Sequence, residues 1–102
     1  MLWAIYCTDK AATAPLRDQH MRSHLDYLDQ RKSILVLAGA TLTDDDSAVH
    51  GSLFIINVQT RSEAEAFSAG DPFTKAGIFE RITVTRMRKS QWNPQADRKS
   101  VV

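Results

Sequence analysis

The most constraining feature of this sequence is an alternation between short apolar runs and longer segments that carry helix signals. Strand-like runs, rich in β-branched and aromatic residues, are predicted at residues 2–8, 34–42, 52–59 and 78–89. Helices are predicted at residues 15–31 and 60–70. The predicted order is therefore βαββαβ, within a chain of 102 residues that has the size of one domain.

Each predicted helix has start signals. Thr13 offers a hydroxyl N-cap ahead of Pro15, and Ser62 with Glu65 has the spacing of a capping box. On the first helix, a stripe of apolar side chains is predicted to face the core: Leu16, Met21, Leu25 and Leu28. Gly39 interrupts the second strand, where we predict a bulge or a close backbone approach.

Two β-α-β halves of this length predict an α+β, ferredoxin-like fold, an antiparallel sheet with two helices on one face. The other face then has no cover, although the strand at 52–59 places apolar groups on both faces. A homodimer that stacks two sheets would bury them, so we predict a homodimer. Residues 1–90 are expected to form the domain, and residues 91–102 a C-terminal tail that dangles or straps a neighbour.

Composition excludes several classes of partner. Hydrophobic residues at 43% and charged residues at 25% are typical of a soluble globular protein, and no apolar run approaches the roughly 20 residues that span a bilayer. The N-terminus lacks the basic region of a secretory signal and Cys7 has no disulfide partner, so we expect a cytoplasmic protein without a membrane partner. A net charge of +1 predicts no nucleic-acid binding, and the basic residues of the last strand are read as a solvated end.

His20 and His24 lie four residues apart on one side of the first helix. This spacing occurs in zinc sites, but no glutamate follows the first histidine and Arg22 stands between them, so no metal is predicted. Two readings stay open: one solvated and one structurally satisfied histidine, or a histidine used in catalysis. His50 is assigned to a turn, and the acidic run 44–46 to a polar loop without the ligand spacing of a calcium site.

Asp71 stands between Gly70 and Pro72, and its carboxylate could simply cap the short turn that follows. In the predicted topology this turn and the first helix can also lie over the same end of the sheet. Asp71 could then meet His24, fix the tautomer of the imidazole and raise the basicity of its other nitrogen, as a general base near neutral pH requires.

Several segments carry a family resemblance through their order and spacing. They are Leu16-Arg17, Arg22-Ser23-His24-Leu25-Asp26-Tyr27-Leu28, Leu37-Ala38-Gly39-Ala40, Gly51-Ser52, Asp71-Pro72-Phe73 and Ala76-Gly77. Over about residues 1–90 the chain resembles the YciI-like family of YCII-related domains. The resemblance implies a ferredoxin-like fold that assembles as a dimeric α/β barrel. It also implies an active site built on a histidine and an aspartate, here His24 and Asp71.

The same resemblance implies cofactor-independent chemistry on small, often ring-containing molecules, such as elimination of a halide. The sequence departs from the common pattern in having Ala40 where a proline often follows the glycine, and in adding His20. Both departures concern residues that would line the active-site cleft. Neither touches the histidine and aspartate.

Four further residues have both a functional and a structural reading. Arg17 either holds an anionic substrate group or is solvated, and Ser52 either lines the cleft or only helps to start its strand. Phe73 is either a substrate platform or core packing, and Cys7 either a nucleophile or a small buried hydrophobe.

We therefore expect an enzyme of the lyase or isomerase type that binds a small molecule, with His24 moving a proton, Asp71 orienting it and no cofactor. The alternative is a non-catalytic metabolite-binding or regulatory module that uses the same cleft. A monooxygenase, with or without haem, is a third possibility that rests on shared barrel architecture alone.

Overall fold

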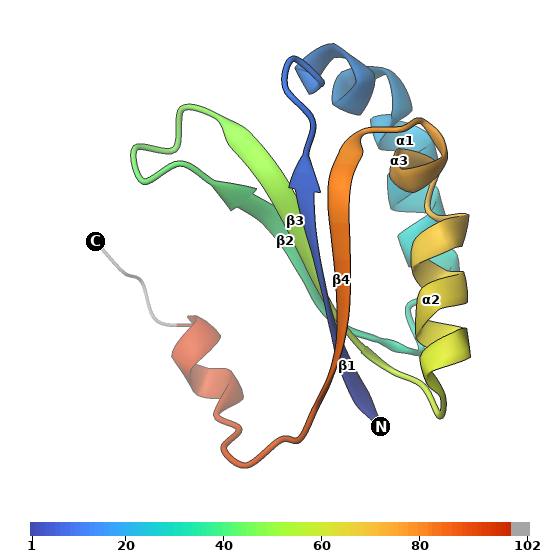
Figure 1. The fold of residues 1–102 in the computed structure, drawn as a ribbon. Coiled ribbons are helices and arrows are strands. Elements are labelled where there is room, and N and C mark those ends of the chain that lie inside the picture. The colour runs from blue at the N-terminus through green and yellow to red at the C-terminus, as the bar shows by residue number, and fades with distance from the viewer. Residues whose placement is uncertain (99–102) are drawn as a thin grey trace.

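The computed structural model describes residues 1–98, which form one four-stranded antiparallel sheet and helices on one of its faces (Figure 1). The sheet order is β2-β3-β1-β4. Along the chain the elements are β1 (Leu2–Asp9), α1 (Ala14–Gln30), β2 (Leu35–Leu42), β3 (Val49–Asn57), α2 (Arg61–Gly70), α3 (Pro72–Lys75), β4 (Phe79–Met87) and the 3-10 helix η1 (Pro94–Arg98). The predicted α+β, ferredoxin-like fold is confirmed. Within residues 1–98, no helix has the length and apolar character that a membrane crossing requires.

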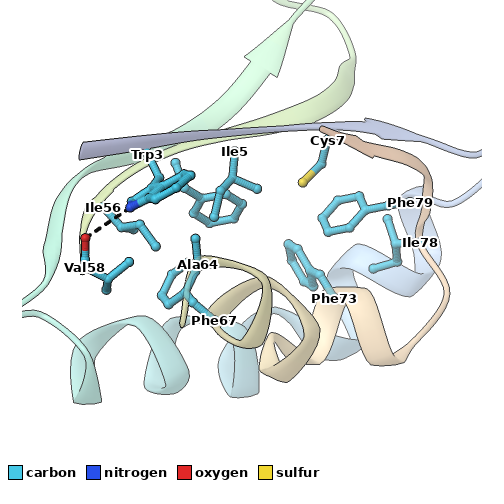
Figure 2. Packing of buried hydrophobic residues seen from close by; sticks show 11 residues of the cluster. Trp3, Ile5, Cys7, Ile56, Val58, Ala64, Phe67, Phe73, Ile78 and Phe79 are labelled. Carbon is cyan, nitrogen blue, oxygen red and sulfur yellow. Dashed lines mark hydrogen bonds between the residues drawn. The ribbon is translucent and has the colours of Figure 1, made fainter. Parts of the chain in front are cut away.

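The core lies between the sheet and the helices (Figure 2). Alternate residues of a strand share one face, so Ile5 of β1 and its register partner Phe54 of β3 both point toward the helices. Phe67 of α2 and Phe73 of α3 pack against them from the other side. The indole N–H of Trp3 donates a hydrogen bond to the Val58 carbonyl at 3.1 Å, which satisfies a buried polar group at one end of the core.

Within residues 1–98, none of the helices α1, α2 and α3 lies over the opposite face of the sheet (Figure 1). Tyr6 of β1 is paired with Leu53 of β3, and Leu37 of β2 is paired with Ile55, so these side chains share the uncovered face. Leu37 is 55% exposed, and Tyr6 is also exposed. The C-terminal segment that contains η1 lies on this side of the sheet, away from the helices (Figure 1).

The buried face of α1 differs from the predicted apolar stripe. Leu16, Met21 and Leu28 pack partly against the core, but Leu25 is 51% exposed. The residues of α1 that are fully buried are polar: Arg17 and His24. Both can be buried because each meets a carboxylate from another element, as described below.

The helix starts also differ in detail. The Thr13 hydroxyl donates to the Lys10 carbonyl at 2.8 Å and does not cap the backbone of α1. Helix α2 is capped by Thr60 rather than by Ser62. The Thr60 hydroxyl accepts the Glu63 N–H at 3.1 Å because Thr60 is extended and α2 begins directly after it.

Strand β3 begins at Val49, three residues before its predicted start, so His50 belongs to a strand and not to a turn. Its ring lies near the Leu42 carbonyl at 3.0 Å. The register of β2 against β3 is irregular between Leu35 and Leu37 and between Thr41 and Leu42, and a Cβ at Gly39 would meet nothing within 4 Å. The bulge or close backbone approach predicted at Gly39 is therefore wrong. The tail beyond β4 contains η1, which the sequence did not predict. The division into a domain of residues 1–90 and a tail of residues 91–102 stays a prediction.

Gly51 and Gly39 make a matched pair for testing the strand packing. A Cβ at Gly51 would lie 2.1 Å from the Cys7 carbonyl oxygen, whereas a Cβ at Gly39 would meet nothing within 4 Å. We expect Gly51→Ala to lower the free energy of unfolding by about 1–3 kcal/mol, the usual cost of overpacking. Gly39→Ala should leave it unchanged or slightly raised. Urea unfolding of both variants checks this, and equal midpoints would contradict it.

Candidate active site

The imidazole of His24 in α1 is hydrogen-bonded to the carboxylate of Asp71, the residue that joins α2 to α3. His24 Nδ1 lies 2.8 Å from Asp71 Oδ1, and both side chains are almost completely buried. A carboxylate accepts hydrogen bonds, so this geometry assigns the proton to Nδ1. Nε2 makes no hydrogen bond within residues 1–98.

Asp71 also has the capping role that its sequence context suggested. Its Oδ1 accepts the Phe73 backbone N–H at 2.9 Å, which caps α3. Asp71 therefore caps α3 and also meets His24, and one oxygen atom makes both contacts. The other oxygen, Oδ2, is buried and has no hydrogen-bond partner in the described chain.

Aromatic side chains hold the His24 ring in place. The Phe73 ring stacks on it with centroids 3.8 Å apart and planes inclined by 2°. Phe54 presents an edge to it at 6.2 Å. These two aromatic contacts and the hydrogen bond to Asp71 together restrict the His24 ring to one orientation.

Arg17 is buried rather than solvated, with 6% of its surface exposed. Its Nε donates to Asp9 Oδ2 at 2.7 Å and its Nη2 to Asp9 Oδ1 at 3.0 Å, a two-pronged ion pair. Nη2 also lies 2.9 Å from both the Gly51 carbonyl and the Ser52 hydroxyl. Nη1 has no hydrogen bond in the described chain.

Asp9 is the site residue that sequence reasoning missed. It ends β1, and its carboxylate neutralises a buried arginine from the following helix. The sequence held a partial signal for this pair. A buried arginine needs an acidic partner, and an aspartate directly after an apolar strand is a candidate for that partner. The sequence alone did not show that Arg17 was buried.

A cavity of about 180 Å³ lies beside His24 and Arg17, between α1 and the strands β2 and β3. Its polar wall is formed by Arg17, His24 and Ser52. The apolar remainder comes from Met21, Leu25, Leu28, Ala38, Gly39, Ala40, Phe54 and Phe73. All five residues predicted for the site are thus brought together, with four on the cavity wall and Asp71 behind His24.

Each of the remaining predicted site residues has its place in this arrangement. Ser52 is buried in β3 and its hydroxyl accepts from Arg17, so it does more than start a strand. Phe73 belongs to the core and also forms part of the wall. His20 takes no part in the cavity wall. No cluster of three or more metal-ligating side chains occurs among residues 1–98.

Cys7 is fully buried under the site, and its environment opposes ionisation. Burial is the main cause that raises the pKa of its thiol to about 12, followed by the nearby carboxylates of Asp71 and Asp9, while Arg17 acts in the opposite direction. A thiol in this state is a poor nucleophile, in keeping with the reading of Cys7 as a small buried hydrophobe.

Thiol labelling provides a check on this environment. The rise from 9.0 to about 12 lowers the thiolate fraction near pH 8 about a thousand-fold relative to an ordinary cysteine. We expect iodoacetamide at pH 8 to modify the native protein at least that much more slowly than the protein unfolded in urea. Mass spectrometry measures both rates, and rapid labelling of the native state would contradict the assignment.

The sequence pattern of the YCII-related domain matches residues 1–88. This chain belongs to the YCII-related domain family. The YCII-related chain is 30% identical over 96 residues to Protein YciI of Escherichia coli O6:H1, a match that covers 87% of this chain and 98% of that protein. Protein YciI of Shigella flexneri matches to the same extent.

Among solved structures, the YCII-related chain is similar to 5-chloro-2-hydroxyhydroquinone dehydrochlorinase (TftG) from Burkholderia phenoliruptrix AC1100, determined in complex with 2,5-dihydroxybenzoquinone. The two are 34% identical with a TM-score of 0.79, over 86% of this chain and 94% of that one. An antibiotic biosynthesis monooxygenase gives a TM-score of 0.53 at 15% identity, over 89% of this chain and 100% of that one. The second similarity shows the shared fold only.

Proposed function

We propose that this chain is an enzyme of the lyase or isomerase type in which His24 transfers a proton to and from a small, ring-containing substrate. The observation that carries the proposal is the hydrogen bond of 2.8 Å between His24 Nδ1 and Asp71 Oδ1, on an imidazole that also lines the cavity. The bond leaves Nε2 as the basic nitrogen. The proposed role of Asp71 is to hold the tautomer and the ring orientation.

In the proposed step, the Nε2 lone pair takes a proton from the substrate. The electron pair left behind moves to form the new double bond. In an elimination, the leaving group departs from the neighbouring carbon with its bonding pair and the imidazolium then releases its proton to water. In an isomerisation, the electron pair of an existing double bond is displaced and takes the proton back from Nε2 at another carbon. The imidazolium formed is stabilised by the Asp71 carboxylate in a buried environment, where such a pair interacts more strongly than in water. Acid–base chemistry of this kind needs no cofactor, and none is proposed.

The size of the cavity favours a substrate with one ring. Pockets for drug-sized ligands range over roughly 300–1,000 Å³, whereas an apolar cavity of about 150 Å³ in another protein accepts benzene. The cavity of this chain is about 180 Å³. Arg17 Nη1 and the Ser52 hydroxyl are proposed to bind substrate oxygen atoms, and Phe73 to contribute an apolar wall. The similarity to TftG supports a hydroxylated ring as the first substrate to test.

The test is a turnover assay with 5-chloro-2-hydroxyhydroquinone and a panel of halogenated and hydroxylated phenols, without added metal or cofactor. Chloride release is followed with an ion-selective electrode and ring conversion by absorbance. Turnover of at least one compound is the expected result. Saturable binding in calorimetry without any product would instead support the alternative, a binding or regulatory module, and would overturn the proposal of an enzyme.

We also propose that the chain forms a homodimer through the uncovered face of its sheet, in a reducing cytoplasmic compartment. An exposed apolar patch on a sheet is unusual for a monomer, and this face carries Tyr6, Leu37, Leu53 and Ile55. The uncovered face presents the same patch on each copy, as a two-fold contact requires.

Leu37→Glu should convert the dimer to a monomer, because two buried carboxylates would face the apolar patch of the other copy. Leu25→Glu is the matched control, since Leu25 is similarly exposed but lies on α1 at the other side of the sheet. Sedimentation at micromolar concentration measures both. A monomeric mass for the unmodified chain would refute the homodimer.

A further inference from the structure

Two buried polar atoms, one on the N-cap of α3 and one within α3, have no hydrogen-bond partner in the described part of the chain. They are Asp71 Oδ2 and Thr74 Oγ1. Asp71 is 1% exposed, so this oxygen has little access to bulk water. A buried carboxylate oxygen without a donor is costly, and so is a buried hydroxyl without an acceptor.

The two atoms belong to Asp71 and Thr74, which lie three residues apart at the start of α3. Asp71 is the N-cap of α3 and Thr74 is the third residue of that helix. Residues three apart are neighbours on the surface of a helical turn, so the side chains of these two positions lie on the same side of α3. Threonine in a helix also adopts two side-chain rotamers rather than one, so its hydroxyl can turn toward a neighbouring acceptor.

We propose that Thr74 is a positioning residue whose hydroxyl donates a hydrogen bond to Asp71 Oδ2, after a change of its side-chain rotamer or through one water, as the outer member of a Thr74–Asp71–His24 chain. The carboxylate is then held by three donors. Two of them, His24 Nδ1 and the Phe73 N–H, bind Oδ1, and the Thr74 hydroxyl binds Oδ2. Rotation of the carboxylate would break this set, so the direction in which it holds the imidazole is fixed.

Cys7 is the competing donor for the same oxygen. Its thiol is buried, and the Asp71 charge contributes to the high pKa of Cys7, so the two groups are near each other. However, a thiol is a weak hydrogen-bond donor, weaker than a hydroxyl. The hydroxyl of Thr74 is the stronger candidate.

The inference rests on the proposed function, and its test has one arm that needs no substrate. Thr74→Val removes the hydroxyl and keeps the shape, and Thr74→Ser restores the hydroxyl. Proton NMR of the His24 Nδ1–H resonance reports on the hydrogen bond to Asp71 directly. We expect this resonance to move or to broaden in Thr74→Val and to return in Thr74→Ser.

The kinetic arm uses the substrate found in the turnover assay. Loss of a hydrogen bond to a charged group predicts a kcat about tenfold lower in Thr74→Val, with KM unchanged, and recovery in Thr74→Ser. If Thr74→Val leaves the Nδ1–H resonance in place, the inference is wrong whether or not the protein is an enzyme. If Cys7→Ala moves the resonance and Thr74→Val does not, the thiol is the donor and the inference is equally overturned.

Discussion

Replacing His24 with glutamine should lower kcat by about 10²–10⁴-fold, the usual contribution of a positioned general acid–base group. Glutamine cannot accept and return a proton near neutral pH, although it is of similar length and polar. His20→Gln is the matched control, because His20 lies one turn earlier on α1 and is not part of the cavity wall. Its turnover should equal that of the unmodified chain.

Asp71→Asn tests the negative charge of Asp71 apart from its hydrogen bonds. One oxygen, Oδ1, accepts from both His24 and Phe73, so the asparagine oxygen can keep both hydrogen bonds and the tautomer. What is lost is the negative charge that stabilises the imidazolium. We therefore expect a kcat between those of His24→Gln and the unmodified chain, measured in the same steady-state assay. If the His24→Gln variant turns over substrate as fast as His20→Gln, His24 does not act as the acid–base group.

Asp9→Ala should lower the free energy of unfolding by about 3–5 kcal/mol, because removing one member of a buried ion pair leaves the other charge without its partner. The remaining charge is that of Arg17, which would keep its bonds to the Gly51 carbonyl and the Ser52 hydroxyl. These bonds place the expected loss toward the lower end of that range. Urea unfolding monitored by circular dichroism measures it.

The chain offers a control for this ion pair. Asp29 and Lys32 form a pair at 3.7 Å whose side chains are 76% and 82% exposed. Exposed pairs contribute about 0–1 kcal/mol, so Asp29→Ala should scarcely change the midpoint of unfolding. If the two alanine variants unfold at the same urea concentration, the Arg17–Asp9 pair does not stabilise the fold as its burial indicates.

The sequence predicted the fold because the signals that define it are local. The period of apolar residues distinguishes a strand such as residues 2–8 from a helix such as residues 15–31, and the order of the elements leaves few arrangements. The ends of elements were less well predicted. Thr60 and Ser62 are both good caps with an acidic residue three positions later, and only the backbone conformation of Thr60 decides between them.

The candidate site could be predicted only in part, because its contacts join distant segments. His24 and Asp71 are 47 residues apart, and periodicity does not report such a contact. The family resemblance suggested the pair, and the structure shows the hydrogen bond. Arg17 is a harder case: on a helical wheel a buried arginine looks the same as a solvated one, and the difference lies in Asp9, which belongs to another element.

The sharing of Asp71 Oδ1 between His24 and the Phe73 amide has a practical consequence for following the site in solution. Any event that lengthens or shortens the His24 contact also alters the acceptor of one backbone N–H. The hydrogen-exchange rate and the nitrogen-15 shift of the Phe73 amide therefore form a native probe within the site. Occupancy of the cavity can be read from a single backbone signal, with no label attached and no substrate consumed.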